Sequence, residues 1–114
     1  GGYYNSPTLN IKNSVSNQVI SSKNCAVLRN YMKNVVENGT GFNAQYKSQT
    51  AGKTATAQSG IYVDGKEKLN TWFVGFYPYD NPKYSIVVMR EGGKSGAGDC
   101  CPVFRTIVEK IDNM

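Results

Sequence analysis

The clearest structural signal in the chain is NTWFVGFYPYDNPKYSIVVMRE, residues 70–91. Its first part, NTWFVGFY, has apolar or small side chains at both alternating sets of positions, which is typical of a strand covered on both faces. KYSIVVMRE is a second strongly apolar strand, and PYDNP between the two has the residues of a turn. Two neighbouring antiparallel strands are therefore predicted here.

A third strand is predicted over residues 53–63, and its composition is unusual. AGKTATAQSG, residues 51–60, holds one lysine, three hydroxyl side chains and no bulky apolar residue. The strand runs to Asp64-Gly65, a favourable turn pair. We expect it at one side of the sheet, where small side chains let another backbone approach closely. Lysine and hydroxyl groups on such an edge favour a ligand with a carboxylate and an amide. The alternative is a solvated edge strand with a surface lysine.

An amphipathic helix is predicted before the strands, over residues 22–38. Ser22 is a candidate N-cap, and Gly39 stands where a left-handed residue would end the helix. The apolar residues fall at steps of three and four and form one stripe. This stripe consists of Cys25, Leu28, Met32, Val35 and Val36.

A second helix is predicted after the strands, over residues 99–112. Asp99 is a candidate cap, and Pro102 falls in the first turn, where its missing N–H costs little. The buried stripe of this helix consists of Phe104, Ile107, Val108 and Ile111.

These elements define the fold class as α+β. An extended lead-in over residues 1–20 and the helix at 22–38 precede a three-stranded antiparallel sheet within residues 53–90, and the helix at 99–112 follows. Both helices are predicted to pack on the sheet.

Composition excludes several classes of function. The 114 residues carry a net charge of +5, from 13 basic and 8 acidic residues, and the basic residues are scattered singly. This favours an ordinary soluble surface over nucleic-acid binding. Histidine is absent, and the three cysteines have neither metal-site nor disulfide-framework spacing. We therefore predict no metal, no cofactor and no histidine-based triad. GGKSGAG, residues 92–98, shares only its glycines with phosphate-binding loops.

The segment GKTATAQ, residues 52–58, resembles the K-T-G box of penicillin-binding proteins and serine β-lactamases. MKNVVENGTG lies before it, and WFVGFYP, YSIVVMREGG and CCPVFRTIVEKI lie after it. Together these blocks resemble class B penicillin-binding transpeptidases, in the order of that family, from Gly1 to about Asp112. The resemblance implies a penicillin-binding transpeptidase fold.

The resemblance also implies roles for four residues. Lys53 would place a positive charge near the substrate carboxylate and the serine proton network, and Thr54 would donate its hydroxyl to that carboxylate. The backbone N–H of Thr56 would form half of the oxyanion hole, and its side chain could touch substrate. Ala55 stands where the family usually has glycine, so its methyl group could crowd the close approach of substrate. The catalytic candidates are thus Lys53 and Thr56, and the substrate-binding candidates are Thr54, Ala55 and Thr56.

The family's nucleophile is missing from the chain. It belongs to an S-x-x-K box, and no serine here has a lysine three residues later. Ser22-Lys23-Asn24 matches the family's S-x-N box formally, but we interpret it as a coincidence at a helix start. Cys25, Cys100 and Cys101 are interpreted as packing residues. Residues 1–114 therefore resemble the C-terminal third of a transpeptidase domain.

The activity that the resemblance implies is that of a peptidoglycan D,D-transpeptidase. Such an enzyme cross-links D-Ala-D-Ala stem peptides through a serine acyl-enzyme, is acylated by β-lactams, and lies outside the cytoplasmic membrane on an N-terminal anchor. The expected partners are the stem peptide, β-lactams and the rest of the domain. Alone, the chain is predicted to be inactive and to self-associate through apolar surfaces that the domain would cover.

Two other classes of function remain open from the sequence. One is a non-catalytic β-lactam sensor or cell-wall-binding module of the same fold, and the other is a structural module without a ligand. An S-x-x-K box upstream of Gly1 would favour the enzyme, and its absence would favour the binding module.

Overall fold

A computed structural model describes residues 17–114, so most of the lead-in predicted over residues 1–20 lies outside the described part. The described chain forms α1, a short 3₁₀ turn η1, three strands, a π-helical turn η2 and α2. Their bounds are α1 Ser22–Asn38, η1 Phe42–Ala44, β1 Ala51–Val63, β2 Lys66–Tyr77, β3 Tyr84–Gly93, η2 Gly96–Cys100 and α2 Cys101–Asp112. The strands form an antiparallel sheet in the order β1-β2-β3. The predicted α+β fold is confirmed.

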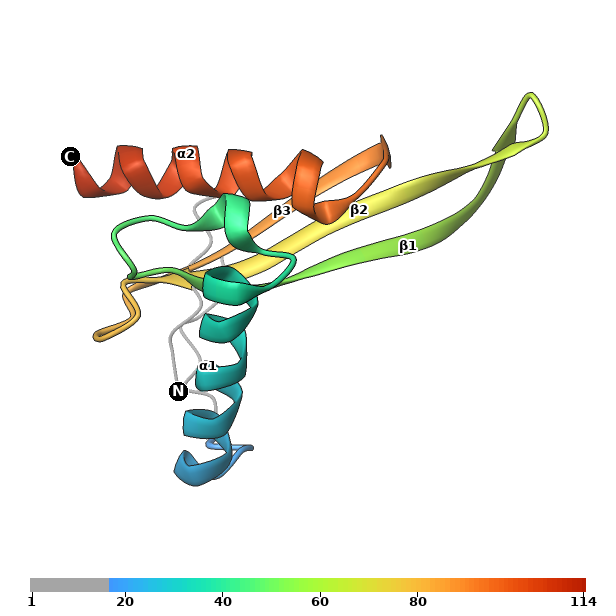
Figure 1. The fold of residues 1–114 in the computed structure, drawn as a ribbon. Helices are drawn as coiled ribbons and strands as arrows, with labels where there is room; N and C mark the ends of the chain where they lie inside the picture. The colour runs from blue at the N-terminus through green and yellow to red at the C-terminus, as the bar shows by residue number, and fades with distance from the viewer. Residues whose placement is uncertain (1–16) are drawn as a thin grey trace, which may run out of the picture.

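The hairpin of β1 and β2 is longer than the sequence predicted. β1 begins two residues before Lys53, and β2 begins directly after the turn, at Lys66. Asp64 and Gly65 both have positive φ angles, 51° and 74°, as a tight hairpin turn requires. The far end of the hairpin extends well beyond both helices (Figure 1). Nothing in the described chain covers this end, where the side chains of Ile61, Tyr62 and Val63 are exposed.

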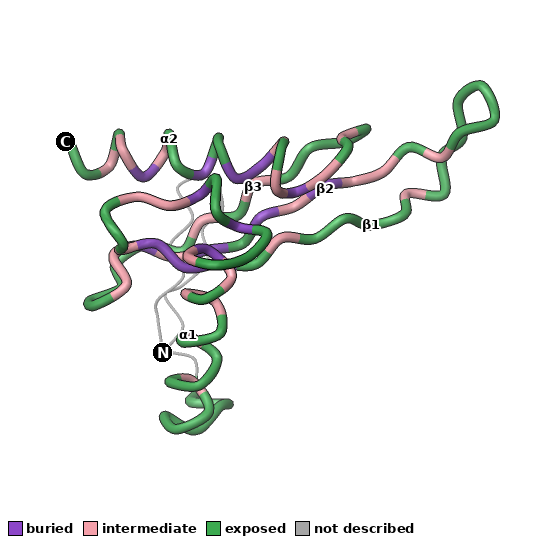
Figure 2. The backbone as a smooth tube through the Cα atoms, viewed as in Figure 1, coloured by how far each residue is buried: buried purple, intermediate pink, exposed green. Residues whose placement is uncertain are grey.

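α2 covers one face of the sheet and contributes Cys101, Phe104 and Val108 to the core. Phe104 packs edge-on against Phe73 of β2, with ring centroids 4.7 Å apart, and both side chains are fully buried. Val108 continues this contact one turn later, and Val36 near the end of α1 joins the same cluster. Buried residues are concentrated where α2, η1 and the beginning of β1 meet (Figure 2).

Within residues 17–114 the opposite face of the sheet is covered at one end only, contrary to the prediction for residues 70–77. There Arg29 of α1 lies over the ring of Phe76, and Ala51, which pairs with Phe76, is fully buried. Residues directly opposite one another in an antiparallel sheet share a face, and side chains alternate between faces along each strand. The register therefore defines one set of residues, which we call the open face: Lys53, Ala55, Trp72, Val74, Val87 and Met89. The side chains of Val74, Val87 and Met89 are 43%, 59% and 42% exposed. The apolar pattern predicted two buried faces, but in the described chain the second face is buried only near Ala51 and Phe76.

The helix ends differ from the sequence prediction in three details. Ser21, not Ser22, caps α1, since its hydroxyl accepts from the N–H of Asn24. Gly39 is extended rather than left-handed, with φ of −129°. Asp99 does not cap α2; it lies in the π-helical turn before the helix and binds the preceding backbone instead. None of the described helices is long and apolar enough to cross a membrane.

A polar cluster anchors the C-terminal end of α2. The carboxylate of Asp112 accepts hydrogen bonds from Lys47, 2.7 Å away, from the hydroxyl of Tyr46 at 3.1 Å, and from the hydroxyl of Tyr77. The Lys47 bond, followed by the Tyr77 bond, lowers the pKa of Asp112 to about 2. The bond to Asp112 likewise raises the pKa of Tyr77 to about 12. The cluster joins the end of α2 to the end of β2 and to the loop before β1.

This cluster predicts a loss of stability in acid. The pKa of Asp112 in the folded state, about 2, lies below its ordinary value of 3.8. Its carboxylate therefore stabilises the fold above the higher value, and this stabilisation disappears as the pH falls through the lower one. We expect the thermal midpoint of the protein to decrease as the pH is lowered from 3.8 to about 2. An Asp112→Asn variant should lose part of this pH dependence. Equal pH dependence in both proteins between the two pKa values would contradict this role of Asp112.

Candidate functional site

The candidate site lies on β1, which has no strand on its outer side among residues 17–114. β1 is thus an edge strand, as its small polar residues predicted. Within it, Lys53 pairs with Val74, Thr54 with Phe73, and Thr56 with Thr71 of β2. All four predicted site residues, Lys53 to Thr56, consequently lie in one regular stretch of an accessible edge.

Lys53 is exposed on the open face. Its ammonium group donates a hydrogen bond to the carbonyl oxygen of Thr54, 2.8 Å away. Among residues 17–114 its ammonium group has no other hydrogen-bond partner, and no carboxylate there forms an ion pair with it. The positive charge of Lys53 is therefore available to an anionic group that approaches the strand edge.

Thr54 projects to the other face of β1, the face that α2 covers. Its hydroxyl lies 2.8 Å from the hydroxyl of Thr40, which comes from the turn after α1. Thr40 could not be identified from the sequence, because no neighbouring residue indicates a contact with a residue fourteen positions later. The pair holds two hydroxyl groups side by side at the strand edge.

Ala55 and Thr56 complete the site. Ala55 is exposed on the open face, and its φ is not positive, so the backbone does not require the glycine that the family usually has there.

The glycine that packing in this part of β1 does require is Gly52. A Cβ atom at Gly52 would lie 2.3 Å from the ring of Phe73, so only glycine lets the strand pass this buried side chain.

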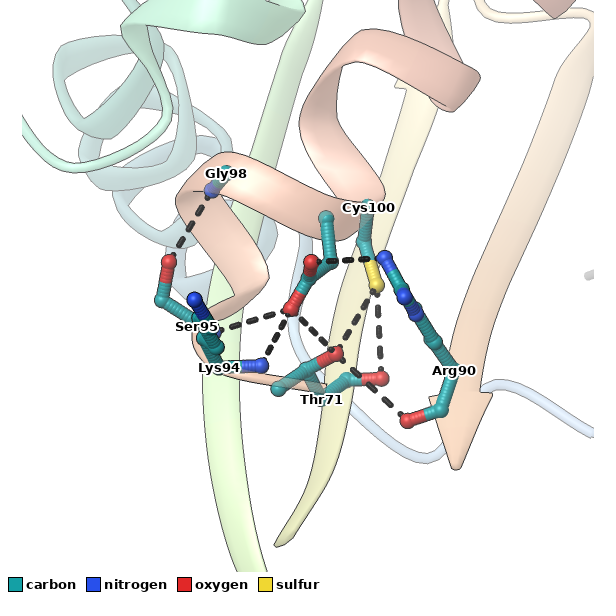
Figure 3. Close-up of polar contacts among 7 residues, drawn as sticks. Thr71, Arg90, Lys94, Ser95, Gly98 and Cys100 are labelled. Carbon is teal, nitrogen blue, oxygen red and sulfur yellow. Dashed lines mark hydrogen bonds and ion pairs between the residues drawn. The ribbon is translucent and has the colours of Figure 1, made fainter. Parts of the chain in front are cut away.

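The turn η2 supports the site from the face that α2 covers. Asp99 holds this turn through the N–H groups of Lys94 and Ser95, 2.6 and 2.9 Å from one carboxylate oxygen, while the other oxygen pairs with Arg90 at 3.0 Å (Figure 3). The backbone bonds, that of Ser95 first, lower the pKa of Asp99 below its ordinary value. The carboxylate is thus charged at neutral pH. Sequence reasoning treated Asp99 only as a helix cap.

Comparison with known proteins identifies this arrangement. The family described as "Penicillin binding protein transpeptidase domain" matches residues 1–109. The chain belongs to this family. Peptidoglycan D,D-transpeptidase FtsI of Buchnera aphidicola is 36% identical over 111 residues, which cover 90% of this chain and 19% of the relative. Peptidoglycan D,D-transpeptidase MrdA of Haemophilus influenzae is 34% identical over 93 residues, or 68% of this chain and 14% of the relative.

Solved transpeptidase structures have the same fold. The transpeptidase domain of FtsI4 D,D-transpeptidase from Legionella pneumophila matches with a TM-score of 0.68 and 30% identity, over 81% of this chain and 36% of that one. The D,D-transpeptidase domain of a peptidoglycan glycosyltransferase from Eggerthella lenta matches with a TM-score of 0.68 and 26% identity, over 90% and 24%. The chain thus spans less than a fifth of the curated relatives and about a third of a solved domain. It corresponds to part of a penicillin-binding transpeptidase domain, and the resemblance to class B enzymes is confirmed.

The other candidates of this transpeptidase chain lie away from Lys53. Ser22-Lys23-Asn24 forms the exposed first turn of α1, at the blue end of the helix that points away from β1 (Figure 1). Cys100 and Cys101 are buried free thiols, and Cys100 contacts the backbone carbonyl of Thr71 at 3.3 Å. Burial raises the pKa of Cys101 to about 11, which keeps its thiol protonated at neutral pH.

Proposed function

We propose that this chain is part of a peptidoglycan D,D-transpeptidase that cross-links stem peptides through a serine acyl-enzyme and is acylated by β-lactams. The observation that carries the proposal is the accessible edge of β1, which presents Lys53 and Thr54 in the order of the K-T-G box. The names of the relatives FtsI and MrdA support the same activity. An extended stem peptide would add to this edge as a further strand.

Each site residue then has a role. Lys53, whose charge has no acidic partner in the described chain, attracts the terminal carboxylate of the stem peptide and influences the proton network of the serine. Thr54 donates its hydroxyl to that carboxylate. The N–H of Thr56 stabilises the oxyanion that forms when the serine attacks the D-Ala-D-Ala bond, because a fixed backbone donor favours developing negative charge. Ala55, between Thr54 and Thr56, forms part of the wall of the binding cleft.

The serine nucleophile has to come from the rest of the domain. The open face supports this assignment, since it carries Lys53 beside exposed Val74, Val87 and Met89. Uncovered apolar side chains of this kind indicate a surface on which another part of a protein packs. We propose that the segment with the S-x-x-K box packs there and brings its serine to Lys53. From the likeness to the penicillin-binding transpeptidase family, we also propose that the full-length protein is anchored in the membrane and acts on its extracytoplasmic side.

Residues 1–114 alone are expected to show no covalent labelling by a fluorescent penicillin. The described chain supplies the wall of the cleft but not the nucleophile, so no acyl-enzyme can form. Labelling of the isolated chain and of the full-length protein, followed on denaturing gels, checks this. A covalent band on the isolated chain would show that one of its own residues is the nucleophile. No band on the full-length protein would contradict the proposed function itself.

Turnover distinguishes the enzyme from a β-lactam sensor of the same fold. The methyl group of Ala55, where the family usually has glycine, is the feature that makes a sensor worth testing. A full-length protein that is acylated by penicillin, releases D-Ala from a D-Ala-D-Ala peptide and transfers the remaining acyl group to an acceptor amine is a transpeptidase. Acylation without any release of D-Ala would support the sensor.

A further inference from the structure

The turn η2 is fixed more firmly than a surface connection needs to be. Asp99 accepts two backbone hydrogen bonds and an ion pair with Arg90, and its Oδ2 also lies 3.4 Å from the hydroxyl of Thr71. Thr71 is fully buried and lies on β2 directly opposite Thr56. Hydrogen bonds to an ionised carboxylate are about twice as strong as neutral ones. Asp99 thus ties the turn to the strand that pairs with the candidate site.

The backbone of the turn at Gly96 also touches the backbones of β1 and β2. A Cβ atom added to Gly96 would lie 2.4 Å from the carbonyl oxygen of Trp72, and 3.0 and 3.2 Å from the O and N atoms of Ala55. These distances leave no room for a side chain, so η2 rests against the Ala55–Trp72 pair. This pair lies between Thr54 and Thr56, the two residues proposed to bind the carboxylate and the oxyanion.

A third contact fixes the turn from the other side. The side-chain amide of Asn43, in η1, donates to the carbonyl oxygen of Ala97 at 3.2 Å. The hydroxyl of Ser95 accepts from the N–H of Gly98 at 3.1 Å and closes the turn on itself. Because of these contacts, a shift of η2 after loss of the Asp99 carboxylate would also shift the backbone of Ala55.

We propose that Asp99 is a positioning residue for the reaction, which holds η2 against Ala55 and thereby fixes the N–H of Thr56 in the oxyanion hole. The proposal rests on the proposed function for its chemistry, but its geometry stands on the contacts above. Misplacement of a catalytic group by about 1 Å can cost about a hundredfold in rate. Loss of the carboxylate therefore affects the acylation step more than it affects binding of the β-lactam.

The test uses Asp99→Asn in the full-length protein. We expect the acylation rate constant with a fluorescent penicillin to fall about tenfold or more, since the oxyanion donor is displaced. The concentration for half-maximal rate should change much less. Arg90→Gln is the matched control, because it removes the exposed partner of Asp99 and leaves both backbone bonds in place. Its acylation rate should stay close to that of the unmodified protein.

A second pair of variants keeps the test valid if Asp99→Asn does not fold. Thr71→Val removes the hydroxyl beside Asp99, and Thr71→Ser retains it. We expect slower acylation in Thr71→Val and recovery in Thr71→Ser. Acylation that is unchanged in both Asp99→Asn and Thr71→Val would overturn the proposal. A loss that merely follows the fall in thermal stability, with faster amide exchange throughout the chain, would also overturn it.

Hydrogen exchange separates this inference from the proposed function. In Asp99→Asn, but not in Arg90→Gln, the amides of residues 54–57 should exchange faster, while those of the buried core around Phe73 should not. If the unmodified protein is not acylated at all, the proposed function fails, and local exchange at residues 54–57 still decides the positioning role. Faster exchange there supports it, and unchanged exchange overturns it.

Discussion

Replacement of Lys53 by alanine in the full-length protein is expected to slow acylation by a fluorescent penicillin by about a hundredfold or more, as for other groups that stabilise charge in a transition state. The side chain is exposed, and its ammonium group donates a hydrogen bond to the carbonyl oxygen of the neighbouring Thr54. The Lys53 side chain therefore contributes little to stability, and the thermal midpoint of the Lys53→Ala variant should be close to that of the unmodified protein. A large loss of rate without a loss of stability is the result that distinguishes a functional lysine from a surface lysine.

Two further lysine variants sharpen this test. Lys66→Ala removes an exposed lysine from the far end of the same hairpin, so it controls for the loss of one positive charge. It should be acylated at nearly the normal rate. Lys53→Arg keeps the charge but replaces a compact ammonium by a planar guanidinium, and we expect an intermediate rate. Equal rates for Lys53→Ala and Lys66→Ala would refute the role assigned to Lys53.

The elements with a strong local pattern could be predicted from the sequence. The apolar steps in residues 22–38, the turn pair Asp64-Gly65 and the small polar residues of β1 each report a local preference that survives in the fold. The position of β1 at the sheet edge also followed, because a strand without large apolar residues contributes little to a core. Lys53 and Thr54 could be placed at that edge because both belong to the predicted strand.

The contacts between distant residues could not be predicted in the same way. Aspartate before a helix is typical of a cap, and the sequence does not show that Asp99 lies beside Thr71, which is 28 residues earlier in the chain. Asp112 is similar, since its partner Lys47 lies 65 residues earlier in the chain. The open face was misread for a different reason. Apolar alternation in residues 70–77 reports that both faces are buried in a complete domain, and it cannot report which part of the domain lies on each face.

The second large effect is expected in the core, where Phe104→Ala should lower the free energy of unfolding by about 3–5 kcal/mol. Phe104 is fully buried, packs edge-on against Phe73, and comes within 2.8 Å of the Cβ position that Gly75 leaves empty. A cavity at this point would lie between α2 and the sheet, where Phe73 and Val108 are also fully buried. The loss can be measured by chemical denaturation of the full-length protein.

Val103 offers the matched control for this prediction. It is the neighbouring residue on α2, but its side chain points away from the sheet and is 46% exposed. Val103→Ala should therefore change stability by less than about 1 kcal/mol, because surface substitutions rarely cost more. Both variants shorten a side chain of α2, and the two side chains differ in burial. The difference between their stability losses therefore measures the packing of Phe104 on Phe73. Equal losses in the two variants would mean that another part of the domain covers Val103, and that α2 is not held chiefly by the face described here.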